Sequence, residues 1–157
     1  MASPVQPVAF NRKAKFDFFI LEKFEAGIAL NGYEVKSIRE GKINLKDSFV
    51  RVLKGEAFLF NCHISPYSKL QGYSEVDPVR TRKLLLKRHE IEKLTVLTGQ
   101  KGHAIIPLSL YFKRGLVKIE IATARGKKLF DKRESIKRRI HDRESQAAVK
   151  SHSGKRR

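Results

Sequence analysis

Basic side chains are the residues of this sequence best suited to chemistry, and they are clustered. The clusters lie within Asn11–Lys15, Arg80–Arg88 and Arg125–Lys128. Several lysines and arginines close together can neutralise neighbouring phosphates, which makes binding strongly dependent on salt. Across the 157 residues, 34 Lys and Arg stand against 16 Asp and Glu, a net charge of +18. The sequence therefore predicts a polyanionic partner, because solubility alone needs far less charge.

The segment Thr81–Lys87 mixes phosphate-binding charge with three consecutive leucines. One helix face cannot easily bury all three. Either some of this apolar surface contacts a partner, such as an unstacked base, or all three leucines lie in the core. The sequence has no Trp and lacks the paired aromatics of an RNA-recognition motif. These absences disfavour a base-stacking platform and favour recognition of RNA shape and backbone.

Nucleophiles, general bases and metal ligands lack the local patterns that catalysis needs. The sequence contains no motif of a nucleotide-binding, zinc-protease or esterase site, and its acidic residues are scattered among basic ones. Cys62 lies in an alternating apolar run, which indicates a small buried hydrophobe rather than a nucleophile. We therefore predict no enzymatic activity, no cofactor and no metal. An enzyme acting on RNA through His63 or His103 stays open as an alternative.

The cysteine content and the hydropathy pattern bear on the compartment. A single cysteine can form neither an intramolecular disulfide nor a Cys-based zinc site. No stretch approaches 18 apolar residues, and Met1–Phe10 lacks the basic and apolar regions of a signal peptide. We expect a cytoplasmic protein with no membrane contact.

Alternation of apolar and polar residues is the main structural signal between Asn11 and Ala124. It is strongest in Leu116–Thr123, where Val117, Ile119, Ile121 and Thr123 share one face. The other alternating runs are Phe16–Phe24, Ser48–Leu53, Ala57–Ile64 and His103–Phe112, and in Ala57–Ile64 the residues expected to face inward are Phe58, Phe60, Cys62 and Ile64. Short glycine-containing links at Lys54–Gly55 and Lys113–Gly115 predict hairpins, and hence a mostly antiparallel sheet.

Helical signals interrupt the predicted strands. Asn31 with Glu34 three residues later has the spacing of a helix start, and Gly41 suits the end of that helix. A second helical region is predicted over Val79–Thr98. About five strands and about three short helices predict a mainly β fold, a small antiparallel barrel like the oligonucleotide-binding (OB) fold, because closure removes exposed strand edges. We expect a flexible N-terminus over 1–10, the barrel over 11–124 and a basic tail over 125–157.

The predicted tail, Arg125–Arg157, carries 13 basic and 4 acidic residues, a net charge of +9 and half of the total. It has few large apolar residues, so burial cannot offset the entropy lost on ordering, and we expect it to be disordered alone. The spacing of Asp131 and Glu134, and of Ile136 and Ile140, favours a helix once a partner is bound. A merely solubilising tail is the alternative.

Seven motifs occur in order along the chain: Phe24–Leu30, Gly32–Ser37, Asp47–Ser48, Gly55–Phe60, Arg80–Leu86, Leu108–Tyr111, and Gly126–Lys128 followed by Asp131–Arg133. In these the sequence resembles the small protein B (SmpB) family, which binds transfer-messenger RNA (tmRNA, also called SsrA) in bacteria. The resemblance covers about residues 11–139. It implies an OB-like barrel that holds the tRNA-like domain of tmRNA, and a basic tail that enters the ribosome.

The resemblance also implies roles for individual residues. Asn11, Glu25 and Leu85 match positions that contact or support the elbow of the tRNA-like domain. The implied phosphate partners are Arg12, Lys13, Arg80, Arg82 and Lys83 in the barrel. At the junction with the tail, Lys127, Lys128, Asp131, Lys132 and Arg133 would act near the decoding centre, and Phe130 stands where many relatives have His. Farther along, Ile136, Lys137, Arg138, Arg139 and Arg143 would belong to the part of the tail that lies in the messenger channel.

Taken together, these implications describe an adaptor of trans-translation. One monomer per tmRNA would deliver it to a stalled ribosome, and the tail would become helical in an mRNA channel left empty. A ribosomal or nucleoid component that binds by charge with little selectivity is the first alternative, since it explains the net charge but not the seven motifs. A cationic protein of the membrane surface is a weaker alternative, because no basic amphipathic helix with aromatic anchors is evident.

Overall fold

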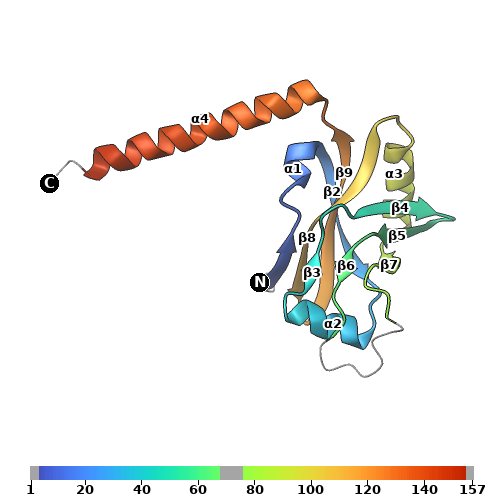
Figure 1. Ribbon diagram of the computed structural model, residues 1–157. Coiled ribbons are helices and arrows are strands. Elements are labelled where there is room, and N and C mark those ends of the chain that lie inside the picture. Colours follow the sequence, from blue (N-terminus) through green and yellow to red (C-terminus); the bar gives the residue numbers. More distant parts are fainter. Residues whose placement is uncertain (1–3, 68–75, 155–157) are drawn as a thin grey trace. The chain divides into compact units, whose positions relative to one another are not determined.

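The computed structural model (Figure 1) describes residues 4–67 and 76–154, and the chain divides into two units at Gly126 and Lys127. Unit 1 contains, in chain order, β1 (Val5–Phe10), α1 (Ala14–Asp17), β2 (Phe18–Ile28), α2 (Gly32–Arg39), β3 (Ile43–Asn44), β4 (Phe49–Leu53), β5 (Glu56–Phe60), β6 (His63–Ile64), β7 (Arg82–Leu85), α3 (Arg88–Thr98), β8 (His103–Lys113) and β9 (Leu116–Gly126). Unit 2 contains α4 (Leu129–Gly154).

The main sheet is antiparallel and seven-stranded, in the order β1-β8-β4-β5-β7-β2-β9. Strands β8 and β9 also pair with each other, so the pairings from β8 through β4, β5, β7 and β2 to β9 form a ring. The pairing between β4 and β8 is short, and its register places Val50 opposite Ile105. β3 and β6 form a separate two-stranded sheet. The predicted antiparallel, sheet-dominated fold is confirmed, and the described helices add α4 to three short ones.

The core lies on the inner face of the ring. Ile119, Ile121 and Thr123 are buried along β9, as their alternation predicted. Ile38 of α2 and Leu94 of α3 are fully buried, and Figure 1 shows these two helices near opposite ends of the sheet. Burying one such aliphatic side chain contributes about 1.5–3 kcal/mol, so each of these residues anchors its helix to the core.

Within the expected flexible segment 1–10, residues 5–10 form a strand, and residues 1–3 lie outside the described part of the chain. Val5–Phe10 is strand β1 and pairs with β8 over Ser109–Lys113, with a register shift between Pro7 and Ala9. Val8 and Ala9 pack against the core. The prolines are tolerated because β1 is an edge strand, where a missing N–H donor leaves no partner unpaired.

Two further expectations fail in the segment around β7. Val79–Thr98 is not one helical region, because Arg82–Leu85 is a strand between β5 and β2, and α3 begins only at Arg88. Burial alternates along β7, with Arg82 and Leu84 inside. The run of three leucines therefore predicted a helix where the chain forms a strand, because the sequence pattern did not count Arg82 as an inward-facing residue.

The first half of Ala57–Ile64 was predicted with the wrong residues facing inward, namely Phe58 and Phe60. Ala57 and Leu59 are fully buried, whereas Phe58 lies toward the outer face. Asn61 has a φ of +59°, and this kink shifts the alternation by one residue, so Cys62 and Ile64 are buried as predicted. The predicted strand from Phe16 also begins later, because α1 occupies Ala14–Asp17.

Most of unit 2 is the helix α4, which covers the segment whose spacing favoured a helix on a bound partner. The backbone N–H of Lys128 donates to Asp131 Oδ2 at 3.2 Å, and Lys127 Nζ donates to Ser135 Oγ at 2.8 Å. An acidic residue in the first turn also suits the helix dipole. Local interactions of this kind support a helix without a buried face.

Candidate nucleic-acid interface

Glu25 is the centre of the candidate interface in unit 1. It lies on the outer face of β2, where the hydroxyl of Tyr111 donates to its Oε2 at 2.5 Å. Lys113 Nζ lies 3.3 Å from both carboxylate oxygens. The hydrogen bond from Tyr111, helped by Lys113 and the charge of Lys118, lowers the pKa of Glu25 although partial burial opposes this. Glu25 is therefore a charged hydrogen-bond acceptor held in one orientation by β8.

The strands beside Glu25 bring further charge to the same face. Directly facing residues of antiparallel strands share a face, and the register places Glu25 opposite Glu120 and Gly27 opposite Lys118. Glu120 in turn lies 4.0 Å from Lys23 Nζ. The two carboxylates are thus surrounded by lysines, which is an arrangement that can accept from base N–H groups while binding phosphates nearby.

Two shallow hollows with shared walls lie next to Glu25. One, of about 300 Å³, is lined by Val5, Pro7, Phe10, Glu25, Ser109, Tyr111 and Glu120. The other, of about 380 Å³, is lined by Phe10, Asn11, Arg12, Lys15, Lys23, Leu108, Ser109 and Glu120. Of the predicted site residues, Asn11 and Arg12 line one hollow and Glu25 lines the other, and the two hollows share Phe10, Ser109 and Glu120.

Asn11 acts as an anchor within this group. Its side-chain amide donates to Pro107 O at 2.9 Å, and its backbone N–H donates to Leu108 O at 2.8 Å. These bonds fix the start of α1 against β8. Arg12 and Lys13, the next two residues, are exposed at that point. Besides the RNA contact predicted for it, Asn11 therefore holds the backbone that carries Arg12 and Lys13.

Leu85 separates from its two leucine neighbours. Leu84 is buried and Leu86 packs against the core, but Leu85 is 56% exposed on the outer face of β7. It lies opposite Gly27, and a Cβ on that glycine would come within 3.2 Å of Leu85 Cβ. Lys83 shares this face and forms an ion pair with Glu56 at 3.0 Å. Leu84 and Leu86 therefore belong to the core, as one alternative predicted. Of the three leucines, only Leu85 presents most of its side chain to solvent, where the other alternative placed a partner.

Arg82 is not placed to bind a phosphate, so that expectation is wrong. Its side chain is 1% exposed, and its Nε donates to Glu34 Oε2 at 2.5 Å. Its Nη1 donates to Cys62 O at 2.7 Å and its Nη2 to Pro78 O at 3.1 Å. A buried guanidinium needs such partners, and here they join α2, β7 and the backbone beside β6.

Arg80 engages the same carboxylate. Its Nε donates to Glu34 Oε1 at 3.1 Å, and its side chain is 31% exposed. Burial opposes the charged form of Glu34, but hydrogen bonds from Arg80, the backbone of Asn31 and Arg82 outweigh it and lower the pKa. The sequence indicated Glu34 only as a helix-capping residue, a role it also has through the Asn31 N–H at 2.9 Å.

Cys62 and the histidines do not form a reactive group. Burial raises the pKa of the Cys62 thiol to about 11, which agrees with the predicted buried hydrophobe. His63 is exposed, and His103 Nδ1 lies 3.4 Å from Lys101 O. Within 4–67 and 76–154, no group of three His, Cys, Asp or Glu residues could hold a metal ion. No helix in that part of the chain is both long and apolar enough to cross a bilayer.

The predicted tail residues share α4 or its start. Phe130 is 71% exposed, and Ile136 and Ile140 are also exposed. The basic residues Arg133, Lys137, Arg138, Arg139 and Arg143 lie at exposed positions of the same helix. Asp131, predicted as a cap, instead lies in the first turn, because α4 begins two residues earlier.

Comparison with known proteins decides the family. The model of the SmpB protein family matches residues 8–151, which span both units. The chain belongs to the SmpB family. SmpB relatives named "SsrA-binding protein" include those of Thermoanaerobacter pseudethanolicus, 60% identical over 135 residues (86% of each chain), and Syntrophobacter fumaroxidans, 57% identical over 143 residues (91% of this chain, 88% of the relative).

A solved structure of an SmpB chain agrees with this assignment. It is described as "tmRNA-SmpB: a journey to the center of the bacterial ribosome", and it matches with a TM-score of 0.67 and 48% sequence identity. The match covers 83% of this chain and 94% of the other. The predicted family is thereby confirmed.

Sequence reasoning missed several residues of the interface in this SmpB chain. Tyr111, Lys113 and Lys118 hold or surround Glu25, yet each follows it by more than 80 residues. Their alternation in β8 and β9 was visible in the sequence, but the strand order that places them beside β2 was not.

Proposed function

We propose that this SmpB-family chain is the tmRNA-binding adaptor of trans-translation, which delivers tmRNA to stalled ribosomes without making or breaking a bond. The observation that carries the proposal is the family match over residues 8–151, which spans the sheet and the basic helix together. Relatives at 57–60% identity are named for SsrA binding. The adaptor acts as a monomer in the cytoplasm, one per tmRNA.

Unit 1 acts as an OB-like barrel that holds the tRNA-like domain. The ring of strand pairings supports this reading. We call the residues that grip the RNA the elbow face: Asn11, Arg12, Lys13, Glu25, Lys83 and Leu85. In this face the Glu25 carboxylate accepts from base N–H donors, and Leu85 covers an apolar base surface. The three cations bind phosphates on either side. Arg80 supports this face through Glu34, and its phosphate contact is limited by that ion pair.

Unit 2 acts inside the ribosome. Lys127, Lys128, Asp131, Lys132 and Arg133 lie near the decoding centre, where Phe130 stacks on a ribosomal base. The rest of α4 occupies an mRNA channel left empty, with Ile136 against its wall and Lys137, Arg138, Arg139 and Arg143 on phosphates. Because messenger in the channel would exclude the helix, its entry reports that no message remains. The exposed positions of Phe130, Arg133 and the residues from Ile136 to Arg143 named above, all on the one helix α4, support the proposal.

Selective binding tests the function most directly. We expect the purified chain to bind tmRNA at least tenfold more tightly than a structured RNA of equal length at about 0.15 M salt, where charge attraction alone is weakened. Glu25→Gln removes the charged acceptor and should reduce this preference. Equal binding to all RNAs with a steep salt dependence would instead favour a packaging protein that binds by charge.

A further inference from the structure

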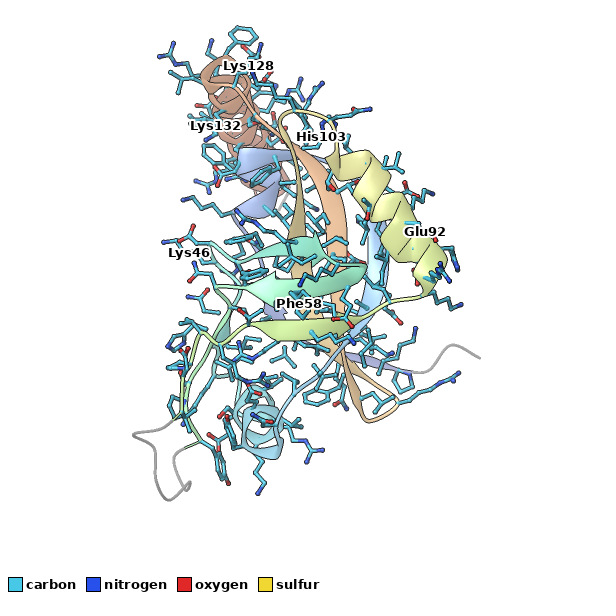
Figure 2. The ribbon with its side chains drawn as sticks, turned by 90° about the vertical axis from the view of Figure 1, so that its right-hand side faces the viewer. Lys46, Phe58, Glu92, His103, Lys128 and Lys132 are labelled. Atoms are coloured by element: carbon cyan, nitrogen blue, oxygen red, sulfur yellow. The ribbon has the colours of Figure 1, made fainter. Side chains whose placement is uncertain are left out.

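The outer face of the β4–β5 hairpin carries a block of three phenylalanines and an arginine. In the register, Phe49 lies opposite Phe60 and Arg51 opposite Phe58. The rings of Phe49 and Phe60 are stacked, with centroids 5.4 Å apart and an interplanar angle of 9°. The guanidinium carbon of Arg51 lies 5.1 Å from the Phe49 centroid. We call these four residues the β4–β5 platform, and Figure 2 shows Phe58 on this side of the sheet.

The platform is not required by the core. The inward positions of the hairpin are filled by Val50, Ala57 and Leu59, all buried. The platform phenylalanines are only half-buried, and Arg51 beside them is exposed. Aromatic rings left together on an outer face and bordered by charge are typical of an interaction surface.

A hollow opens beside the platform where β4 pairs with β8. These strands share the register pair Val50–Ile105. The hollow measures about 430 Å³ and is lined by residues 49–52 of β4, residues 103–105 of β8 and Thr98 of α3. Its lining includes Phe49 and Arg51 from the platform and His103 and Thr98 on the other side. It therefore combines an aromatic wall with a cation and with side chains that can hydrogen-bond a heterocycle.

The charge pattern identifies the chemistry of the partner. The register places Arg51, Phe58 and Lys83 in one row across β4, β5 and β7, so an aromatic ring lies between two cations. Successive nucleotides of a single strand present the same sequence of groups, with flat bases between phosphates. A duplex hides its base faces, and an acidic peptide offers no stacking partner for the rings.

We propose that the β4–β5 platform binds an unpaired stretch of RNA, with one base stacked on Phe58 and the next entering the hollow beside Phe49. Arg51 binds the flanking phosphate on one side, and Lys83, which the platform shares with the elbow face and which is paired with Glu56, borders the other. This contact goes beyond the proposed function, because it is a second RNA site that does not require a folded tRNA-like domain. It differs from the expectation drawn from the sequence, which disfavoured a stacking platform, because the aromatics come together only through strand pairing.

An abasic comparison isolates stacking from charge. The full-length chain is titrated with a labelled ten-nucleotide single-stranded RNA and with the same backbone lacking bases, at about 0.15 M and about 0.3 M salt. Electrostatic binding by α4 is the same for both probes, so it cancels in the ratio of affinities. We expect the natural chain to prefer the base-containing RNA about tenfold, which is the range of one stacked base.

Matched variants assign the preference to the platform. Phe58→Leu should reduce the ratio several-fold, because only the base in the hollow still contributes, and Phe58→Tyr should keep it, because the ring is retained. Arg51→Gln should weaken both probes and lower the salt dependence by about 0.7 in logarithmic slope, the value for one phosphate contact of a single strand. Val96→Ala and Arg88→Gln, exposed changes on α3, control for apolar and charge loss.

A photocrosslink gives a second readout if Phe58→Leu folds poorly. A 4-thiouridine oligonucleotide should attach to a peptide containing residues 49–60 of the unaltered chain. The proposal is overturned if the natural chain shows no preference for bases, if folded Phe58→Leu keeps the preference, or if crosslinks fall only on unit 2. Leu85→Ala should weaken tmRNA but not the oligonucleotide, so failure here is distinguishable from failure of the adaptor function.

Discussion

Glu34 and Arg82 form an ion pair inside the protein, with Arg82 Nε 2.5 Å from Glu34 Oε2 and the side chains 2% and 1% exposed. The pair joins α2 to β7, the strand that also carries Lys83 and Leu85 of the elbow face. A guanidinium that nucleotide-binding proteins commonly offer to phosphate is used here to fix the strand beneath the binding surface. This relationship changes what mutation of the residue should do.

Arg82→Met should destabilise the fold by about 3–5 kcal/mol, because it removes one of the two cations that pair with the buried Glu34 carboxylate and also removes a donor to the carbonyls of Cys62 and Pro78. Urea denaturation measures the loss. Lys83→Met, on the exposed side of the same strand, is the matched control and should change stability by less than about 0.5 kcal/mol. The double change Glu34→Gln with Arg82→Met should recover part of the loss. A folded Arg82→Met chain whose only defect is weaker RNA binding would contradict the structural role.

The stability should also depend on pH through Glu34. Its folded pKa lies below the usual 4.5, so the folded chain holds fewer protons than the unfolded chain in that range. The stabilisation is therefore fully present above about pH 4.5 and is lost as pH falls through the folded pKa. Denaturation midpoints between about pH 3 and pH 7 measure this, and Glu34→Gln should be less stable at neutral pH with a flatter profile. An equally steep profile in that variant would show that other carboxylates dominate.

Gly27→Ala should separate stability from binding. The added Cβ would lie 3.2 Å from Leu85 Cβ, which is fixed to the backbone, so β7 must shift by a few tenths of an ångström at Leu85. Removing a strand glycine also favours folding, so we expect stability to change by less than about 1 kcal/mol. Displacing Leu85 should nonetheless weaken tmRNA binding several-fold, as measured by fluorescence anisotropy. Gly115 is in a hairpin at a φ of +75°, so Gly115→Ala is a poor control; Gly32→Ala, with open space around its Cβ position, is the appropriate one.

Cys62 should react slowly with thiol reagents while the protein is folded. Burial raises its pKa to about 11, so little thiolate is present at pH 8 and access is blocked. Labelling in and out of denaturant measures the difference, and we expect it to be at least about a hundredfold. Rapid labelling of the folded chain would mean that the segment around Cys62, between β5 and β6, opens readily.

Truncation after Gly126 should leave unit 1 folded with most of its affinity for tmRNA. Both buried apolar clusters lie within residues 8–124, so the cut removes no member of the core. The salt dependence of RNA binding should decrease, because the helix takes many cations with it. Rescue of stalled ribosomes in a reconstituted translation system should be lost. Equal loss of tmRNA binding would contradict the division of labour between the two units.

The sequence predicted the strands whose alternation is complete, such as β9 with Ile119 and Ile121 inside. It failed where a polar residue faces inward or where the chain kinks. Arg82 breaks the apolar period of β7, and Asn61, with a φ of +59°, shifts the period after β5. Neither the partners of a buried charge nor a left-handed backbone position can be read from local hydropathy.

The candidate interface was predictable only in part. Asn11, Glu25 and Leu85 were identified through the family resemblance, and the structure brings Asn11 and Glu25 to adjacent hollows. Tyr111 was not predicted as a site residue, because its contact with Glu25, 86 residues away in the sequence, depends on how the strands are arranged in the sheet. Long-range register of this kind follows from the whole fold and not from any window of sequence.

The hydrogen bond between Tyr111 and Glu25 also has a consequence for biosynthesis. Glu25 belongs to the second strand of the chain, whereas its donor lies in β8 and the strand that pairs beside it is β9. During translation, the acceptor therefore emerges long before the groups that orient it, and a nascent chain that ends at α3 has none of them. The proposed elbow face is therefore complete only after β8 and β9 have been made, when nearly all of unit 1 has emerged.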